Sequence, residues 1–552
     1  MATDPRPFTA RELWLAALFY GALAAAAFFP SVFLGEVLFP LHTDQINPWR
    51  ASVSTERLRE LAERDNPVMT DKLWLFHPDN QVFARAVGAG RVPLWNPYIL
   101  CGTPYLGQLL CPVFYPPYWL LAGDHDEHRY GLLTALHFAL AGWLAYLYLR
   151  NARLPPSAAL FGGVAFAFCG PMFARAHYYM TLFPIVWLPL ALLLVDRFTA
   201  SGSRRTLLMI APVAALMLLA GFPQMAIYAF YVAALYALCA GSARSALRRV
   251  GDAVLVSLAL GLGIVLASVQ LVPAVQALVL STRGAQSTTD IAQHALALDS
   301  LATLVVPHAF GDPTWSLDTR ISNWLKAAFL PATADNFTES TIYVGVLPLL
   351  LALGAWRAQR GRILLALAAL LLALAIVPAW QPGLVARLPG LNAGDPRRTL
   401  LPAAGLLALG AAFGFDALAD SRARRIVTAA AVLLLALTGA MLVWLWLDGG
   451  GVVRLIETRM SVRHGTVVQD YLASLPAGER AALEGEHVRY LRAAFLSAVV
   501  LAAAAVGARG GGRGGGARCR SSPCSCSWPT CSRSVCRSTA ARARPGSSHP
   551  IR

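Results

Sequence analysis

Two adjacent arginines, Arg397 and Arg398, offer the clearest binding chemistry in the sequence. They directly precede the apolar run that begins at Thr399, so we expect them at the start of a membrane helix. A guanidinium presents a fork of N–H donors that fits a phosphate, and a helix N-terminus adds positive potential. The pair therefore predicts a site for a lipid phosphate or pyrophosphate. Simple contact with phospholipid headgroups is the alternative.

Other polar side chains stand beside or within apolar runs. Glu339 is a candidate carboxylate for acid–base or metal chemistry, or a helix cap favoured by the helix dipole. His177 could contact a phosphate or hydroxyl, or anchor the end of a span at the membrane surface. Gln224 could bind substrate or form a hydrogen bond to a neighbouring helix. His137 and Gln270 lie inside apolar runs, where a hydrogen bond between helices is the commoner role.

The stretch 90–121 is almost uncharged and rich in Trp, Tyr, Pro and Gly. Its six prolines exclude one continuous helix. Trp and Tyr favour the headgroup level, and irregular backbone at that depth needs cover from protein or a water-filled cavity. We therefore expect an interfacial or re-entrant loop in which Trp95, Asn96 and Tyr98 line a cavity for a lipid-attached polar group. An aromatic belt without a substrate is the alternative.

A short amphipathic helix is expected just before this stretch, over Asp79–Ala89. Asp79 is a favourable N-cap, and Gly90 is a favourable helix end. The same segment of the chain contains further carboxylates at Asp44, Asp65 and Asp71. These four aspartates precede the aromatic stretch, and they make this part of the loop the first place to look for acid–base chemistry.

Composition indicates how these residues are positioned. The chain has 552 residues, of which 57% are hydrophobic and 14% charged, and its mean hydropathy is +0.53. Soluble domains contain about 25% charged residues, so we predict an all-α polytopic membrane protein. The net charge is +16, but nine arginines follow Gly507, and the remaining +7 suits a membrane protein with basic cytoplasmic loops. We expect no nucleic-acid partner.

The C-terminal tail, 508–552, is rich in Arg, Gly and Cys and has no apolar periodicity. It contains five of the nine cysteines, but their spacing matches no standard zinc ligand pair. We interpret the tail as disordered and as the product of a shifted reading frame, with the authentic sequence ending near Gly507. The tail is assigned no function.

Residues 1–507 are predicted to form one multi-span membrane domain. A membrane helix needs roughly 20 apolar residues. About 12 segments meet this criterion approximately: 13–34, 130–149, 158–174, 178–195, 206–221, 224–240, 253–278, 341–356, 363–380, 399–418, 426–447 and 490–507. The first is too long for the core of a signal peptide and is interpreted as an uncleaved anchor.

Arginine placement predicts the orientation of the spans. With a cytoplasmic N-terminus, five short inner loops contain 14 arginines, whereas the short outer turns 175–177 and 222–223 contain one. This asymmetry follows the positive-inside rule. It places four longer segments outside, where the chemistry is expected: 35–129, 281–340, 381–398 and 448–489.

Several of these stretches also carry a family resemblance. They are NPVMTDKLWLFHP (66–78), GRVPLWNPYILCGTPYL (90–106), PVFYPP (112–117), AFCGPMFARAHYYMTLFPIVWLPLALLLVDRF (167–198), GFPQMAIY (221–228), TESTIYVGVLPLLLAL (338–353) and DPRRTLLPAAGLLALGAAFGFDAL (395–418). In this order, over most of 40–420, they resemble the bacterial YfhO-type membrane proteins. That family is related to the GT-C glycosyltransferases, which take sugar from a polyprenyl-phosphate carrier at the outer membrane face.

The resemblance implies a GT-C-like fold in the bacterial inner (cytoplasmic) membrane, with its active face outward. GT-C enzymes use an acidic residue of the first outer loop as general base or metal ligand, and the match transfers this role to Asp71. Asp44 and Asp79 are weaker candidates. The chain departs from the family pattern at 108–111, where QLLC replaces a more polar segment, and at Cys101, where Gly is usual.

The favoured hypothesis is a glycosyltransferase that moves a sugar from a polyprenyl phosphate to a cell-envelope acceptor. Asp71 would deprotonate the acceptor hydroxyl while Arg397 and Arg398 hold the phosphate, and Glu339 is the second carboxylate. A divalent cation stays open as a cofactor, because no single stretch offers a ligand set. A transporter or flippase, or a non-catalytic scaffold for lipid-linked glycans, is the alternative. Transporters often show repeat symmetry, which the sequence lacks.

Overall fold

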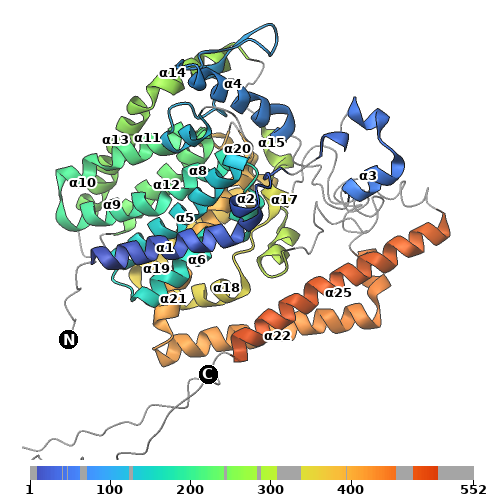
Figure 1. Cartoon of the computed structure of the whole chain (residues 1–552). Coiled ribbons are helices and arrows are strands. Elements are labelled where there is room, and N and C mark those ends of the chain that lie inside the picture. Colours follow the sequence, from blue (N-terminus) through green and yellow to red (C-terminus); the bar gives the residue numbers. More distant parts are fainter. Residues whose placement is uncertain are drawn as a thin grey trace, which may run out of the picture. The chain divides into compact units, whose positions relative to one another are not determined.

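The computed structural model describes residues 9–39, 42–45, 48–62, 71–122, 128–240, 245–281, 287–307, 337–392, 394–455 and 476–507. Asp65 and the tail from residue 508 lie outside these ranges. Within them, regular structure is almost entirely helical (Figure 1). The strands described there are β1 (Trp95–Asn96) and β2 (Thr103–Pro104), which pair antiparallel in one small hairpin.

Ten helical segments among the described residues have the length and apolar composition to cross a membrane. They are α1 (Ala10–Ala27), α5 (His128–Asn151), α6–α7 (Pro156–Ala174), α8–α9 (Tyr179–Ser201), α12 (Pro223–Ala240), α13 (Ala246–Leu266), α19–η9 (Gln359–Ala379), η10–α21 (Pro396–Ala417), α22 (Ser421–Leu447) and Arg480–Ala504 of α25 (Ala477–Gly507). The prediction of an all-α polytopic membrane protein is therefore confirmed.

Three of the expected spans have a different form. Segment 206–221 becomes α10 (Arg204–Leu208) and α11 (Ile210–Leu219), and Pro212 cannot donate the hydrogen bond that would join them. Segment 253–278 divides at Ala267 into α13 and α14 (Ser268–Val279). Segment 341–356 becomes helical only at Val346, in α18 (Val346–Ala352) and η8 (Leu353–Arg357).

The most deeply buried helices form the centre of the bundle. α8–α9 and α21 are apolar around their whole circumference and almost entirely buried, which is the pattern of helices surrounded by other helices. α5 and α6 pack against each other, and α1 packs on α5. Tyr20 of α1 reaches between Gly142 and Gly163 to donate a hydrogen bond of 3.0 Å to the Leu160 carbonyl.

Peripheral helices expose apolar side chains. α13, α22 and α1 present large residues such as Leu258, Leu437 and Trp14 outward. α22 and α25 lie side by side (Figure 1). Exposed apolar faces of this extent are expected for helices in contact with lipid.

The first long loop, between α1 and α5, contains several short elements. They are α2 (Phe29–Phe33), η1 (Thr43–Gln45), η2 (Trp49–Ser52), α3 (Thr55–Ala62), the π-helix η4 (Lys72–Phe76), α4 (His77–Gly88), the hairpin, η5 (Tyr105–Gly107) and η6 (Pro116–Leu121). The helix expected over 79–89 is present as α4, but its start was wrong. Pro78 is in its first turn, a favourable position, and Asp79 is a buried residue within that turn instead of its N-cap.

The remaining elements connect the spans. They are α15 (Thr288–Gln293), η7 (Leu298–Leu304), α17 (Phe337–Ser340) and α20 (Pro382–Ala386). α17 contacts both α7 and η10, so it brings a connecting segment against the ends of two spans. The face of the bundle formed by the first long loop, α17 and η10 is called the loop face below.

Candidate functional site

Glu339 of α17 is the centre of a cluster of charged residues on the loop face. Its Oε2 accepts a hydrogen bond of 2.7 Å from Nη2 of Arg175, and its Oε1 accepts one of 3.1 Å from Nε of Arg398. Arg175 follows α7 (Gly170–Ala174), and Arg398 belongs to η10 (Pro396–Thr399). Three segments that are far apart in the sequence therefore meet at one carboxylate.

Gln224, in the first turn of α12, completes the cluster. Its Oε1 accepts a hydrogen bond of 2.8 Å from Nη1 of Arg398, whose guanidinium also lies 5.0 Å from the centre of the Phe222 ring. Gly394 makes this approach possible, because a Cβ atom there would lie 2.5 Å from the Gln224 amide. We call Arg175, Gln224, Glu339 and Arg398 the arginine–carboxylate cluster.

The charge state of Glu339 follows from its neighbours. Burial disfavours the ionised carboxylate, but the positive charges of Arg175 and Arg398 outweigh this and lower the pKa of Glu339 to about 2. Both carboxylate oxygens are occupied by guanidinium donors. A carboxylate with this pKa is a weak proton acceptor, and the geometry suits a residue that positions two arginines.

Asp71 approaches the cluster through Tyr178. Burial, and then the negative charges of Asp71 and Glu339, raise the pKa of the Tyr178 hydroxyl. Tyr178 directly precedes α8 (Tyr179–Val186), whereas Asp71 directly precedes η4 and is exposed. The exposed fraction rises from 1% at the Arg175 side chain to 14% at Glu339 and 27% at Arg398. The cluster is therefore closed to solvent at Arg175 and open to solvent at Arg398.

The two arginines expected to act together have different environments. Arg397 is 2% exposed and forms a two-pronged ion pair with Asp395, with Nη2 2.6 Å from Oδ2 and Nε 3.0 Å from Oδ1. Arg398 alone belongs to the cluster and is partly exposed. The structure therefore brings together Asp71, Glu339, Gln224 and Arg398 of the expected residues. Arg397 is paired with Asp395 instead and influences Glu339 only through its charge.

His177 lies beside a buried lysine. Burial, and then the positive charge of Lys72, lower the pKa of His177 to about 4, so its imidazole is neutral at pH 7. Lys72 is 2% exposed, and its ammonium lies 3.3 Å from the centre of the Tyr130 ring. A neutral imidazole can donate a hydrogen bond to a phosphate but brings no charge to it.

The residues expected to form a substrate wall have contacts within the first long loop. Asn96 is buried, and its Nδ2 donates a hydrogen bond of 3.2 Å to Oδ1 of Asp79, while its Oδ1 accepts one of 3.0 Å from the Tyr98 backbone. Burial raises the pKa of Asp79 to about 6. Trp95 is exposed and packs on Gly102, and Tyr98 is also exposed. Asn96 therefore has a structural contact, and only the two aromatic residues face outward.

Polar side chains of α5 and α14 form hydrogen bonds that anchor the first long loop. Nδ1 of His137 lies 2.7 Å from the Leu133 carbonyl, so it carries the proton, and Nε2 accepts from the Tyr115 hydroxyl at 2.7 Å. Gln270 donates a hydrogen bond of 2.6 Å to the Cys111 carbonyl. His137 and Gln270 therefore have a structural hydrogen-bonding role, which is the commoner role expected for both from the sequence.

Metal ligands do not gather in the described part of the chain: no group of three or more His, Cys, Asp or Glu side chains there could hold an ion. A divalent cation stays an untested prediction.

Sequence reasoning missed Arg175 and Tyr178 as parts of the site. A usable signal existed for Arg175. It is the single arginine of the two short outer turns, 175–177 and 222–223, where the positive-inside rule predicts few positive charges. Tyr178 offered no comparable signal. Its proximity to Asp71 and Glu339 depends on how the first long loop packs on α8.

No protein-family model and no curated protein matches the chain. The structure alone therefore shows which class of protein this chain belongs to. It is an all-α polytopic membrane protein with a cluster of arginine and carboxylate groups at one end of its spans.

Proposed function

We propose that the protein is a GT-C-type glycosyltransferase, which transfers a sugar from a polyprenyl phosphate to a cell-envelope acceptor on the outer face of the membrane. One observation carries this proposal: an exposed carboxylate, Asp71, and a partly exposed guanidinium, Arg398, gather with Tyr178 and Glu339 on the loop face. A base and an anion ligand at the level of the lipid headgroups are the two groups that this reaction needs.

Arg398 is the phosphate ligand in this proposal. Glu339 and Gln224 occupy its Nε and Nη1, whereas Nη2 has no hydrogen bond to any residue that the structure describes. Two fixed contacts orient the guanidinium, and the remaining N–H donors stay available for phosphate oxygens. The charges of Arg175, Arg398 and Glu339 sum to a single positive charge beside the expected phosphate position. The Asp71 carboxylate balances that charge over the whole site, so the phosphate is held by the local guanidinium donors.

Asp71 is the general base. The acceptor hydroxyl attacks the anomeric carbon as the bond to the phosphate oxygen breaks, and the hydroxyl proton passes to the Asp71 carboxylate. The polyprenyl phosphate leaves with the bonding electron pair, and Arg398 stabilises its negative charge. The direct displacement inverts the anomeric centre.

The location of the cluster favours an enzyme over a transporter. Transporters hold their substrate near the middle of the bilayer, at broken helices. Gln224 and Arg398 instead belong to the first turns of their spans, and Glu339 belongs to a connecting helix. This position suits a reaction between a lipid headgroup and a water-soluble or surface acceptor.

Lipid analysis of a deletion strain tests the proposal. We expect a polyprenyl-phosphate-linked sugar to accumulate in the extracted lipids, with the wild-type gene restoring its level. Arg398→Ala should fail to restore it, whereas Arg422→Ala, which changes an exposed arginine at the opposite end of the spans, should restore it fully. Unchanged polyprenyl-phosphate sugars in the deletion strain would contradict the proposal.

A further inference from the structure

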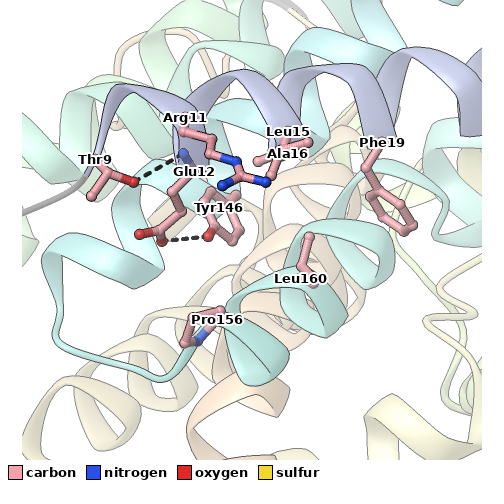
Figure 2. A pocket seen from close by; sticks show the side chains of 9 residues that line it. All are labelled: Thr9, Arg11, Glu12, Leu15, Ala16, Phe19, Tyr146, Pro156 and Leu160. Carbon is pink, nitrogen blue, oxygen red and sulfur yellow. Dashed lines mark hydrogen bonds between the residues drawn. The ribbon is translucent and has the colours of Figure 1, made fainter.

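A cavity of about 330 Å³ lies between α1, α5 and α6 (Figure 2). None of the residues that line it belongs to the arginine–carboxylate cluster. Its apolar part is lined by Leu15, Ala16, Phe19 and Leu160. Polar groups of Thr9, Arg11, Glu12 and Tyr146 gather toward one end, where α1 begins (Figure 2). The cavity therefore has a charged mouth and an apolar body.

The two ends of the cavity lie at different depths of the bilayer. α1 begins at Ala10 and is one of the membrane spans. Arg11 precedes Phe19 by eight residues, which is about 12 Å along a helix axis. A charged residue at the start of a span belongs to the headgroup level, and a residue about 12 Å deeper lies among acyl chains. The cavity thus extends from headgroups into hydrocarbon.

The positive and negative charges at the mouth of the cavity do not cancel completely. Glu12 is already paired: its Oε1 accepts hydrogen bonds of 2.6 Å from Nε of Arg150 and 2.6 Å from the Tyr146 hydroxyl. Arg11 is exposed and forms no hydrogen bond or ion pair with any residue that the structure describes. Glu12 and Arg150 cancel each other, so Arg11 leaves a single positive charge at the mouth. An anionic ligand is favoured there.

We propose that this cavity binds an anionic phospholipid of the surrounding bilayer. Its phosphate contacts the Arg11 guanidinium, and a segment of one acyl chain lies along Leu15, Ala16 and Phe19. Ligand cavities usually have volumes of about 300–1,000 Å³, so this one accommodates a part of a single chain and leaves the rest of the lipid in the bilayer. The site is independent of the reaction proposed at the loop face.

Native mass spectrometry of the full chain provides the test. The protein is placed in bilayers of equal phosphatidylglycerol and phosphatidylcholine with identical acyl chains, released from them, and its retained lipids are counted. One arginine at a membrane surface contributes about 1 kcal/mol toward an anionic lipid, which corresponds to about fivefold. We expect more phosphatidylglycerol than phosphatidylcholine on the wild type, and a preference about fivefold weaker on Arg11→Ala.

Three further variants locate the lipid. Arg11→Lys should keep most of the preference, because it keeps the charge. Arg204→Ala, which removes an exposed arginine at the start of α10, should behave like the wild type. Leu15→Trp should lower retention of phosphatidylglycerol, because the larger ring enters the cavity from an exposed position. Equal retention of both lipids by the wild type, an unchanged preference in Arg11→Ala, or unchanged retention of phosphatidylglycerol in Leu15→Trp would overturn the proposal.

Discussion

Asp196 and Glu339, two carboxylates near opposite ends of the spans, are both paired with arginine, but their surroundings differ. Asp196, near the end of α9 (Leu188–Ser201), accepts one hydrogen bond of 2.9 Å from Arg360 and one of 3.0 Å from Tyr236. Glu339 on the loop face is shared by Arg175 and Arg398. One carboxylate with one arginine is a neutral structural tie. One carboxylate with two arginines keeps a positive charge that can receive an anion.

The largest expected effect concerns stability at Glu339. Glu339→Gln leaves the guanidinium of Arg175, which is 1% exposed, without its ion-pair partner. Removing one partner of a buried ion pair costs about 3–5 kcal/mol. Asp196→Asn should cost less, because Arg360 is 38% exposed and can turn toward water. Thermal unfolding of the two variants in one detergent measures the difference. A larger loss in Asp196→Asn would reverse the comparison.

The next largest effect is expected on activity, where loss of Arg398 and loss of Arg360 should have different consequences. Arg398→Ala removes the proposed phosphate donor, and loss of one such donor typically lowers the rate by about 10²–10³-fold. Arg360→Ala should leave the rate within a factor of a few, although it weakens the tie to Asp196. Transfer from a polyprenyl-phosphate sugar, assayed in membranes with matched protein levels, measures both. Equal losses of rate in Arg398→Ala and Arg360→Ala would mean that the location of the removed arginine does not matter.

Three of the four residues of the arginine–carboxylate cluster could be predicted from the sequence. Glu339, Gln224 and Arg398 were predicted as site residues because each is a polar group at the end of an apolar run. The distinction between Arg397 and Arg398 could not be predicted, since adjacent arginines look alike in the sequence. In η10, successive side chains point about 120° apart, as in any 3₁₀-helix. One therefore meets Asp395 and the other meets Glu339.

The span pattern was more predictable than its details. Apolar length and arginine asymmetry predict an all-α membrane protein without knowledge of any contact. The breaks at Met209 and Ala267 and the late start at Val346 depend on local backbone conformation. Burial of Asp79 depends on packing of the first long loop, so the sequence suggested a helix cap instead.

The pKa values of two carboxylates on the loop face, Asp79 and Glu339, are shifted in opposite directions, and the pH dependence of stability should reveal the shift of Asp79. The pKa of Asp79 is raised by burial from 3.8 to about 6, whereas that of Glu339 is lowered to about 2. Asp79 therefore contributes stability that is present below about pH 4 and lost as the pH rises through 6, by about 3 kcal/mol at 1.36 kcal/mol per pKa unit. Asp79→Asn should raise the unfolding temperature at pH 7.5 and have little effect at pH 4. An equal shift at both values would contradict this account.

The smallest effects are expected in the hairpin. Asn96→Ala removes the Nδ2 donor to buried Asp79, and an unsatisfied buried group costs about 1–3 kcal/mol. Trp95→Ala changes an exposed ring and should leave stability within about 0.5 kcal/mol of the wild type. Activity that falls in Trp95→Ala at unchanged stability would identify it as a substrate contact. Loss of stability in step with activity would favour a packing role.

The most direct test of the proposed reaction is Asp71→Asn. The amide keeps the shape of the carboxylate and its ability to accept a hydrogen bond, but removes its charge and basicity. Because Asp71 is exposed, the variant should insert and fold normally. Loss of a general base costs about 10²–10⁴-fold in rate, so Asp71→Asn should fail to restore glycan modification in the deletion strain, whereas Asp44→Asn should restore it. Full restoration by Asp71→Asn would contradict the assignment of Asp71 as the base.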